Sequence, residues 1–303
     1  MVKIGILGAD TLIAGEIIRI LINHPETVIS NLYAPALTGR SVSSLHHGLI
    51  GESPLYFTDK INIEDLDLLF INERNELSEK IVAQLNNLPE LKVVALSRDF
   101  IPGVGVEDGL SEINRKSLVR GARVAYILPP AVVPALIALA PLANFLLLNS
   151  EIDINISLPQ ELTNTSNIAS LKEIVTRILK ERQSSFNCLI NLTVNPEPKE
   201  LRSSVTKIKI KNTLPLEEIE KIYEGIYDDH NFTFLSRSEI TAVEVEGTQK
   251  TVIYLDKPEN DVLEIKVVSD ARMRGGAGDA VHVMNLFFGL HEKTGLRLKA
   301  SRF

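Results

Sequence analysis

The 303-residue chain lacks several features that would point to a particular compartment or partner. Its single cysteine, Cys188, excludes an intrachain disulfide and any metal site built from several cysteines. No apolar run approaches the roughly 18 residues that suggest a membrane span. The first apolar segment follows no charged leader with a small-residue cleavage site. We therefore expect a cytoplasmic protein with no membrane partner.

The chain also lacks blocks of basic residues and any grouping of metal ligands. Its 32 lysines and arginines face 39 aspartates and glutamates, a net charge of -7, which argues against nucleic acid as the main partner. The histidines have no metal-ligand spacing, and we predict no metal site. They are His24, His46, His47, His230, His282 and His291, with His46 and His47 expected in a solvated loop.

The first half of the chain alternates apolar strands with helices. Strands are predicted over 2–7, 28–32, 66–72, 91–96 and 123–128, and helices over 13–22, 76–88 and 113–120. This alternation is typical of an α/β fold with a doubly wound parallel sheet covered on both faces. We predict a Rossmann-like dinucleotide-binding domain over residues 1–148, completed by a C-terminal helix within 279–303.

From about residue 149 the apolar residues alternate at period two, which predicts half-buried strands. These strands are expected over 151–158, 189–194, 205–211, 240–246, 251–255 and 262–268, with helices over 168–183 and 216–227. The pattern indicates a second, α+β domain over residues 149–278 with a largely antiparallel sheet. One face of that sheet is available to pack on helices or on another subunit.

Residues 122–142 lie where the two patterns meet and predict a strand, a Pro129-Pro130 corner and an apolar helix that starts near Ala131. In two-domain enzymes of this architecture such a seam usually carries the chemistry. The nature of the side chains at this corner therefore bears directly on function.

Two glycine clusters are candidates for a nucleotide. Gly8, Ala9, Thr11 and Gly15 lie between a strand and a helix, where small residues let a backbone approach pyrophosphate, although the Thr11 side chain should crowd a phosphate. Gly275 and Gly276, within residues 274–278, precede the last helix and suit an anion or a nicotinamide. For both clusters the alternative is a turn that binds nothing. Cys188 is interpreted as a small core residue rather than a nucleophile.

Six stretches together resemble the N-acetyl-gamma-glutamyl-phosphate reductases of arginine biosynthesis, within the aspartate-semialdehyde dehydrogenase superfamily. They are AGEIIRILINHP (14–25), HGLIGESPLYFTD (47–59), LSRDF (96–100), GLSEINR (109–115), LPLEEIEKIYEGIY (214–227) and GGAGDAVHVMNLFFGLHEKTGLRLK (275–299). The resemblance implies reduction of an acyl phosphate by NADPH through a cysteine thioester, with a histidine as acid/base. It also implies that Asn285 borders the nicotinamide and that the second domain forms a homodimer or homotetramer.

The chain departs from this family where the resemblance places the nucleophile. The family's Asn-Pro-Gly-Cys turn falls on residues 127–130, so the cysteine position falls at about Pro130, and residues 119–145 contain neither cysteine nor serine. Proline offers no nucleophile and no backbone N–H. We therefore expect that the family's route cannot operate here.

Three further elements of the family's site are altered. Residues 158–167 replace a glycine-rich loop and its histidine segment, and no histidine occurs between His47 and His230. Residues 195–202 keep an arginine of the substrate-binding segment but not its pattern. Ala34 and Pro35 stand where the family often has Ser-Arg for the 2'-phosphate of NADP, so NAD is as good a candidate as NADP.

Three hypotheses follow. The first is a non-catalytic family member retained for dimerisation, for regulating an active paralogue or for binding a ligand. The second is an active NAD(P)-dependent oxidoreductase that forms no covalent intermediate or that uses Cys188 or another group. The third is a purely structural role for the open face of the second sheet.

Overall fold

The structure of the protein is a computed structural model. It describes residues 1–96, 105–163, 167–198 and 200–300 of the chain. Residues 97–100 of the stretch 96–100, residues 164–166 of 158–167 and Lys199 therefore lie outside the described part. The chain forms two compact units. The first contains Met1–Leu128 and Gly276–Arg297, and the second contains Pro129–Gly275 and the residues after Arg297. No helix among the described residues is long and apolar enough to cross a membrane.

The first unit is built on a six-stranded parallel sheet with the strand order β2-β1-β3-β4-β6-β5. This confirms the predicted doubly wound α/β fold. Strand β3 is buried at all four positions, as expected for a strand covered on both faces. The strands are β1 (Val2–Leu7), β2 (Thr27–Tyr33), β3 (Leu68–Ile71), β4 (Lys92–Ala95), β5 (Val106–Asp108) and β6 (Val124–Tyr126).

Among its described residues the first unit has four α-helices, and α8 packs against α1 and α3. They are α1 (Leu12–Leu21), α2 (Glu76–Ala83), α3 (Ser111–Val119) and α8 (Ala277–Phe287). Helix α2 ends at Ala83, five residues before the predicted end, because a 3-10 turn at Leu85–Asn87 follows it. Helix α8 begins at Ala277, two residues before its predicted start at 279, and Gly276 is its N-cap.

The second unit contains a six-stranded mixed sheet with the order β10-β11-β12-β9-β7-β8. In β9, exposed and buried residues alternate from Lys207 to Ile210, with the two lysines exposed and the two isoleucines buried. This is the predicted period-two pattern. The strands are β7 (Ile152–Pro159), β8 (Ile190–Glu197), β9 (Ser203–Lys211), β10 (Thr233–Ser236), β11 (Thr251–Glu259) and β12 (Val262–Asp270).

The sheet is largely antiparallel, as predicted, and one predicted strand is wrong. The pairs β7/β8 and β10/β11 are parallel, because helices or long loops connect those strands as crossovers, and the other pairs are antiparallel. Residues 240–246 form no strand. A 3-10 helix occupies Ala242–Val245, and Thr241 and Glu244 form a capping box at its start, while β10 takes the edge position.

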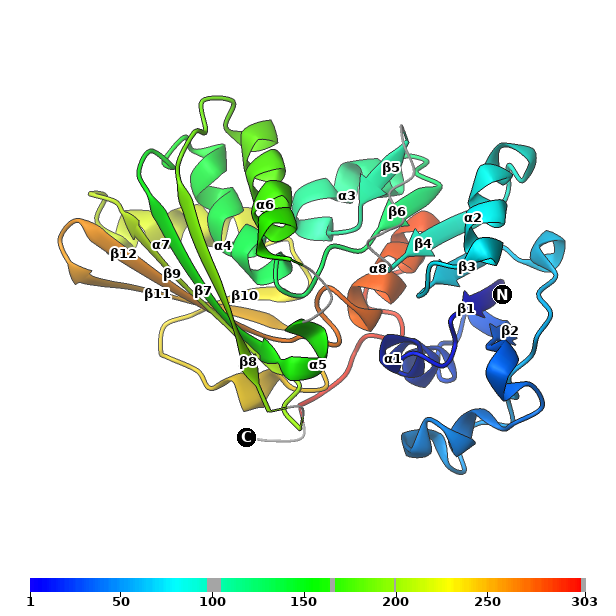
Figure 1. Ribbon diagram of the computed structural model, residues 1–303. Coiled ribbons are helices and arrows are strands. Elements are labelled where there is room, and N and C mark those ends of the chain that lie inside the picture. The colour runs from blue at the N-terminus through cyan, green and yellow to red at the C-terminus, as the bar shows by residue number, and fades with distance from the viewer. Residues whose placement is uncertain (97–104, 164–166, 199, 301–303) are drawn as a thin grey trace. The chain divides into compact units, whose positions relative to one another are not determined.

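The described part of the second unit has three long helices and one short helix, and α6 and α7 both pack against α4 over the sheet (Figure 1). They are α4 (Val133–Asn144), α5 (Gln160–Thr163), α6 (Ile168–Arg182) and α7 (Leu216–Tyr227). Because α4 packs on β9 and β12, residues 129–148 belong to the second unit. The first compact unit ends at Leu128, whereas the predicted first domain extends to residue 148, and that domain boundary stays a prediction.

Helix α4 contains an internal proline, and α7 compensates for it. Pro141 has no amide to donate to the carbonyl of Ile137 four residues earlier. The Tyr227 hydroxyl donates to that carbonyl at 2.5 Å, and the Tyr223 hydroxyl donates to the carbonyl of Ala138. The orphaned carbonyl therefore finds a donor on α7, which lets an apolar helix with an internal proline remain buried.

Candidate functional site

The Pro129-Pro130 corner forms a tight turn that leads into α4. The Pro129 carbonyl accepts hydrogen bonds from the amides of Val132 at 2.8 Å and Val133 at 3.1 Å. Pro129 is buried and Pro130 is partly buried, and the flanking Leu128 and Ala131 are also buried. The position that the resemblance assigns to the nucleophile thus carries side chains that neither titrate nor form hydrogen bonds.

Gly275 closes on this corner within the second unit. Its φ is +73°, and a Cβ added there would lie 2.6 Å from the Cα of Pro130 and closer still to the Pro130 nitrogen. Only glycine permits such an approach in this conformation. The backbone at Gly275 therefore lies directly against the corner, and Gly276 is the N-cap of α8 in the first unit.

The single thiol lies away from the corner. Cys188 precedes β8 and lies beside Ser150. Ser150 follows shortly after Asn144, the last residue of α4, so the thiol lies near the C-terminal end of that helix. The twelve residues of α4, about 18 Å, separate that end from the corner. Burial raises the pKa of the Cys188 thiol, the opposite of what a nucleophile requires.

The second unit has one histidine, and it also lies away from the corner. The His230 ring follows α7 and contacts the Tyr227 ring at 5.6 Å between centroids. Tyr227 in turn reaches the middle of α4, at Ile137, rather than its start. Among the described residues, no group of three or more His, Cys, Asp or Glu side chains is placed to hold a metal ion.

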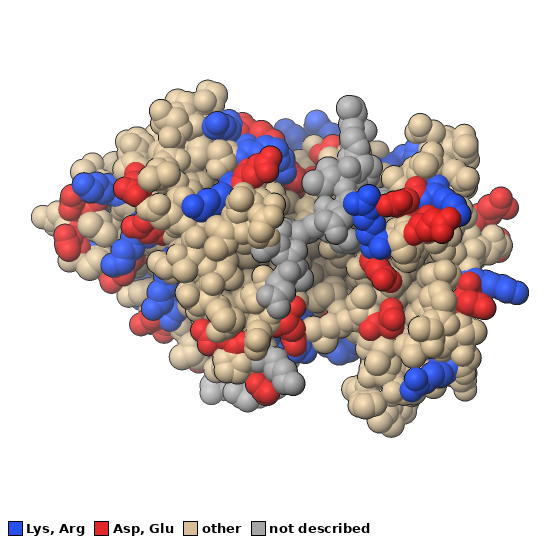
Figure 2. Space-filling view, viewed as in Figure 1, with Lys and Arg blue, Asp and Glu red and all other residues tan. Residues whose placement is uncertain are grey.

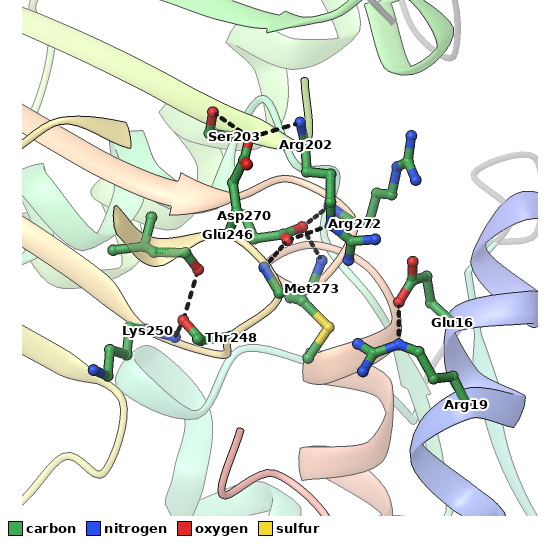
Figure 3. A network of polar contacts seen from close by, with 12 residues as sticks. Glu16, Arg19, Arg202, Ser203, Glu246, Thr248, Lys250, Asp270, Arg272 and Met273 are labelled. Carbon is green, nitrogen blue, oxygen red and sulfur yellow. Dashed lines mark hydrogen bonds and ion pairs between the residues drawn. The ribbon is translucent and has the colours of Figure 1, made fainter. Parts of the chain in front are cut away.

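Arg202, the arginine retained from the substrate-binding segment, forms an ion pair with Asp270 (Figure 3). Its Nε donates to Asp270 Oδ2 at 2.9 Å, and the same carboxylate accepts the amides of Gly247 and Arg272 at 2.6 and 2.8 Å. Burial raises the pKa of Asp270, and the nearby Arg202 guanidinium opposes that rise. This arginine therefore holds the turn after β12 in place.

The first glycine cluster forms a closed turn between β1 and α1. The amides of Gly8 and Ala9 both donate to the Tyr33 carbonyl, at 3.2 and 3.1 Å, and the Thr11 amide donates to Gly8. Thr11 is the N-cap of α1, and its hydroxyl accepts the amide of Ala14 at 3.2 Å. The predicted crowding by Thr11 thus has a structural role, because its hydroxyl caps the helix.

Sequence reasoning missed the contact between His46 and this turn. A Cβ on Gly15 would lie 2.5 Å from His46 Nδ1, and His46 Nε2 lies 2.9 Å from the Ala9 carbonyl oxygen. The His46 ring also meets the buried Phe57 ring edge-on. His47 is exposed as predicted, but His46 packs against the turn. The only sequence feature that pointed to this contact was a pair of histidines within a glycine-bearing loop.

Asn285 is fully buried in the first unit, and its amide is fully engaged. The amide nitrogen donates to the carbonyls of Glu292 and Thr294 at 3.1 and 2.9 Å, and Oδ1 lies 3.1 Å from His24 Nε2. These bonds hold the turn that follows α8. A place for Asn285 beside a nicotinamide stays a prediction that this geometry does not favour.

Comparison with known proteins agrees with the resemblance. The model for the NAD-binding domain of semialdehyde dehydrogenases matches residues 3–121. N-acetyl-gamma-glutamyl-phosphate reductases from Bacteroides fragilis and Parabacteroides distasonis are 33% and 32% identical, over 100% of this chain and of each relative.

Solved structures show the same fold at low sequence identity. Aspartate semialdehyde dehydrogenase II from Vibrio cholerae has a TM-score of 0.70 at 12% identity and covers 95% of this chain and 99% of its own. The Candida albicans aspartate semialdehyde dehydrogenase with NADP has a TM-score of 0.72 at 13% identity, covering 95% and 98%. With full-length relatives above 30% identity, the chain belongs to the N-acetyl-gamma-glutamyl-phosphate reductase family.

Proposed function

We propose that this chain is a non-catalytic member of its family, retained as a binding, regulatory or structural paralogue. The observation that carries the proposal is the Pro129-Pro130 corner, a buried turn without a nucleophile that packs against the backbone of Gly275. A thiolate must displace phosphate and hold the acyl group until hydride arrives, and proline supplies no atom for either step.

In the described part of the second unit, Cys188, His230 and Arg202 are not placed to replace the missing thiol and imidazole. Cys188 has a raised pKa and lies near the far end of α4, and His230 packs on Tyr227. Arg202 is committed to the buried Asp270. The positions of Cys188, His230 and Arg202 thus support the non-catalytic assignment that the altered sequence elements suggested.

We also propose that the first unit binds a nicotinamide dinucleotide at the turn between β1 and α1. In the described part of the chain, the amides of Asp10, Leu12 and Ile13 form no hydrogen bond and lie at or just before the start of the helix, which suits a pyrophosphate. Ala34 and Pro35 offer no side-chain donor to a 2'-phosphate, which favours NAD over NADP. In its reduced form the dinucleotide would supply hydride.

A homodimer or homotetramer, with an active paralogue as a further partner, remains a proposal, as does a cytoplasmic location. The oligomer is supported by the open face of the second sheet, where exposed side chains of positive and negative charge alternate across neighbouring strands. Lys209 pairs with Glu264 on β12 and lies opposite Asp153 on β7. A single monomeric species by light scattering at working concentration would refute the oligomer.

The second candidate is an active NAD(P)-dependent oxidoreductase that reduces an acyl phosphate to a semialdehyde by a route outside the family mechanism. The retained turn from Gly8 to Gly15 favours it, because a scaffold alone has no need for free amides at that helix start. The two candidates differ in turnover and share cofactor binding.

The experiment assays the purified full chain with N-acetyl-gamma-glutamyl phosphate and NADPH or NADH, with the Bacteroides fragilis reductase as the positive control. We expect no cofactor oxidation above background. Turnover at a rate comparable to that of the control would overturn the non-catalytic assignment and establish the second candidate.

A pair of variants at one position tests the cofactor proposal separately. Leu12→Pro removes one amide at the first helical position, where proline is well tolerated, and Thr11 already has the extended backbone that proline requires of its predecessor. Leu12→Ala keeps the amide. By titration calorimetry, NAD affinity should fall for L12P and hold for L12A, and equal affinities would exclude this turn as the cofactor site.

A further inference from the structure

A hollow of about 780 Å³ opens in the first unit at the amino ends of β5 and β6. The end of α2, the end of α3 and the first residues of the two strands line it. Cofactors of doubly wound sheets bind at the carboxyl ends of the strands, where Gly8 follows β1. This hollow therefore lies at the opposite edge of the sheet from the turn proposed to bind the dinucleotide.

Three basic side chains line the hollow. Lys116 and Arg120 are exposed and lie four residues apart at the end of α3, so that they project from the same face of the helix. The Arg123 Nη2 atom donates to the carbonyls of Leu85 and Leu88 at 2.9 and 2.7 Å, which fixes its guanidinium in the wall. Like charges at this helical spacing are unfavourable unless an anion lies between them.

The hollow contains little negative charge to balance these cations. Among the described residues that line it, Glu107 alone is acidic, and Glu107 Oε2 accepts the side-chain amide of Asn114 at 2.8 Å. Within the residues that the structure describes, none of Lys116, Arg120 and Arg123 forms an ion pair with a carboxylate. An excess of positive charge thus gathers here on a chain whose net charge is -7.

The excess is a local property of this hollow. A second hollow of about 600 Å³ on the outer face of α6 also has three basic residues, but Glu173 and Glu181 accompany them, and Arg177 pairs with Glu181 at 3.1 Å. Basic and acidic side chains are likewise interspersed over the face shown in Figure 2. The hollow at β5 and β6 therefore differs in charge balance rather than in the number of basic groups.

We propose that this hollow binds a small organic polyanion, a phosphate ester or a polycarboxylate, at a site separate from the dinucleotide turn. Guanidinium groups recognise planar carboxylates and phosphates through paired hydrogen bonds, and Ser117 and Asn86 add polar groups to the lining. A hollow of this volume accommodates a ligand with an organic body, larger than a bare phosphate ion. The inference does not depend on whether the chain is catalytic.

The test is titration calorimetry on the full chain with fructose 1,6-bisphosphate, citrate and inorganic phosphate as probes. We expect at least one organic anion to bind in the micromolar to low millimolar range, with affinity that falls as salt is added. The double variant K116Q/R120Q should weaken that binding by about tenfold or more, since two charge-assisted contacts are lost.

The matched control is K172Q/K180Q on α6, which removes two charges from the balanced hollow and should leave binding unchanged. Both pairs are surface side chains, so thermal unfolding should match wild type. The proposal would be overturned if neither organic anion binds at millimolar concentration. It would also be overturned if the two double variants bind with equal affinity. Inorganic phosphate that binds as tightly as both organic anions would overturn the assignment of an organic ligand.

Discussion

The contact between Gly275 and the proline corner can be tested with one pair of glycine substitutions. Gly275→Ala places a Cβ against backbone atoms of Pro130 and Pro129, which cannot swing away as a side chain would. Gly247 is the matched control, because it has a similar φ of +76° in the same unit and open space around its Cβ position. Both substitutions carry the cost of a left-handed conformation, and only Gly275→Ala adds a clash.

The structure sets the expected magnitudes. Left-handed backbone costs about 1–2 kcal/mol for a residue with a Cβ, so G247A should lose about that much stability. Overpacking adds about 1–3 kcal/mol, so G275A should lose about 2–5 kcal/mol in total. At about 2–4 °C per kcal/mol for units of this size, the two variants should differ clearly in Tm.

The assay is differential scanning calorimetry of wild type and both variants, with circular dichroism to verify that each folds. If G275A and G247A lower Tm equally, the corner has room for a methyl group and is not closed by backbone. That result would remove the physical basis for regarding this corner as sealed by the Gly275 backbone, whereas the absence of a nucleophile at Pro130 would stand.

Three further predictions concern single groups. Tyr227→Phe should destabilise the second unit by about 1–3 kcal/mol, because it leaves the buried carbonyl of Ile137 unpaired. The loss should be much smaller in a Pro141→Ala background, where the alanine amide can donate to that carbonyl. Chemical denaturation measures both effects, and additive losses of stability would contradict the pairing. The hydrogen bond from His282 holds the pKa of Glu292 at about 2, so Glu292 contributes up to about 3 kcal/mol above pH 4.5 that is lost as pH falls towards 2. In acid titrations the stability gap between wild type and E292Q should close over that window, and a constant gap would be inconsistent with the depressed pKa. Cys188 should alkylate slowly with iodoacetamide at pH 7 and faster only above the usual thiol range, whereas fast labelling at pH 7 would indicate a thiolate.

Periodicity predicted most elements of the fold, and its failures have local causes. Residues 106–108 form β5 with only three residues, too few for a period to register, and its pairing with β6 is a long-range contact. Residues 240–246 alternate like a strand, yet the Thr241–Glu244 capping box closes a 3-10 turn there. In that segment local hydrogen bonds outweigh a hydrophobic pattern that is too short to decide between the two.

The candidate site was predictable where it depends on residue identity, and not where it depends on contacts. The missing thiol at Pro130 is visible in the sequence, because proline excludes that chemistry in any conformation. The approach of Gly275 to the corner and of His46 to Gly15 joins residues distant in the chain. Such contacts follow from the packing of the folded chain, which a single sequence does not contain as spacing.

The pairing of Pro141 with Tyr227 has an evolutionary consequence. A proline inside α4 is tolerable only while α7 offers a hydroxyl to the carbonyl of Ile137, so the two positions lie under a joint constraint. Relatives that carry any other residue at the position of Pro141 restore the amide and release the tyrosine to become phenylalanine. The two positions should therefore covary across the family, and their covariation would trace helix packing that is maintained independently of catalysis.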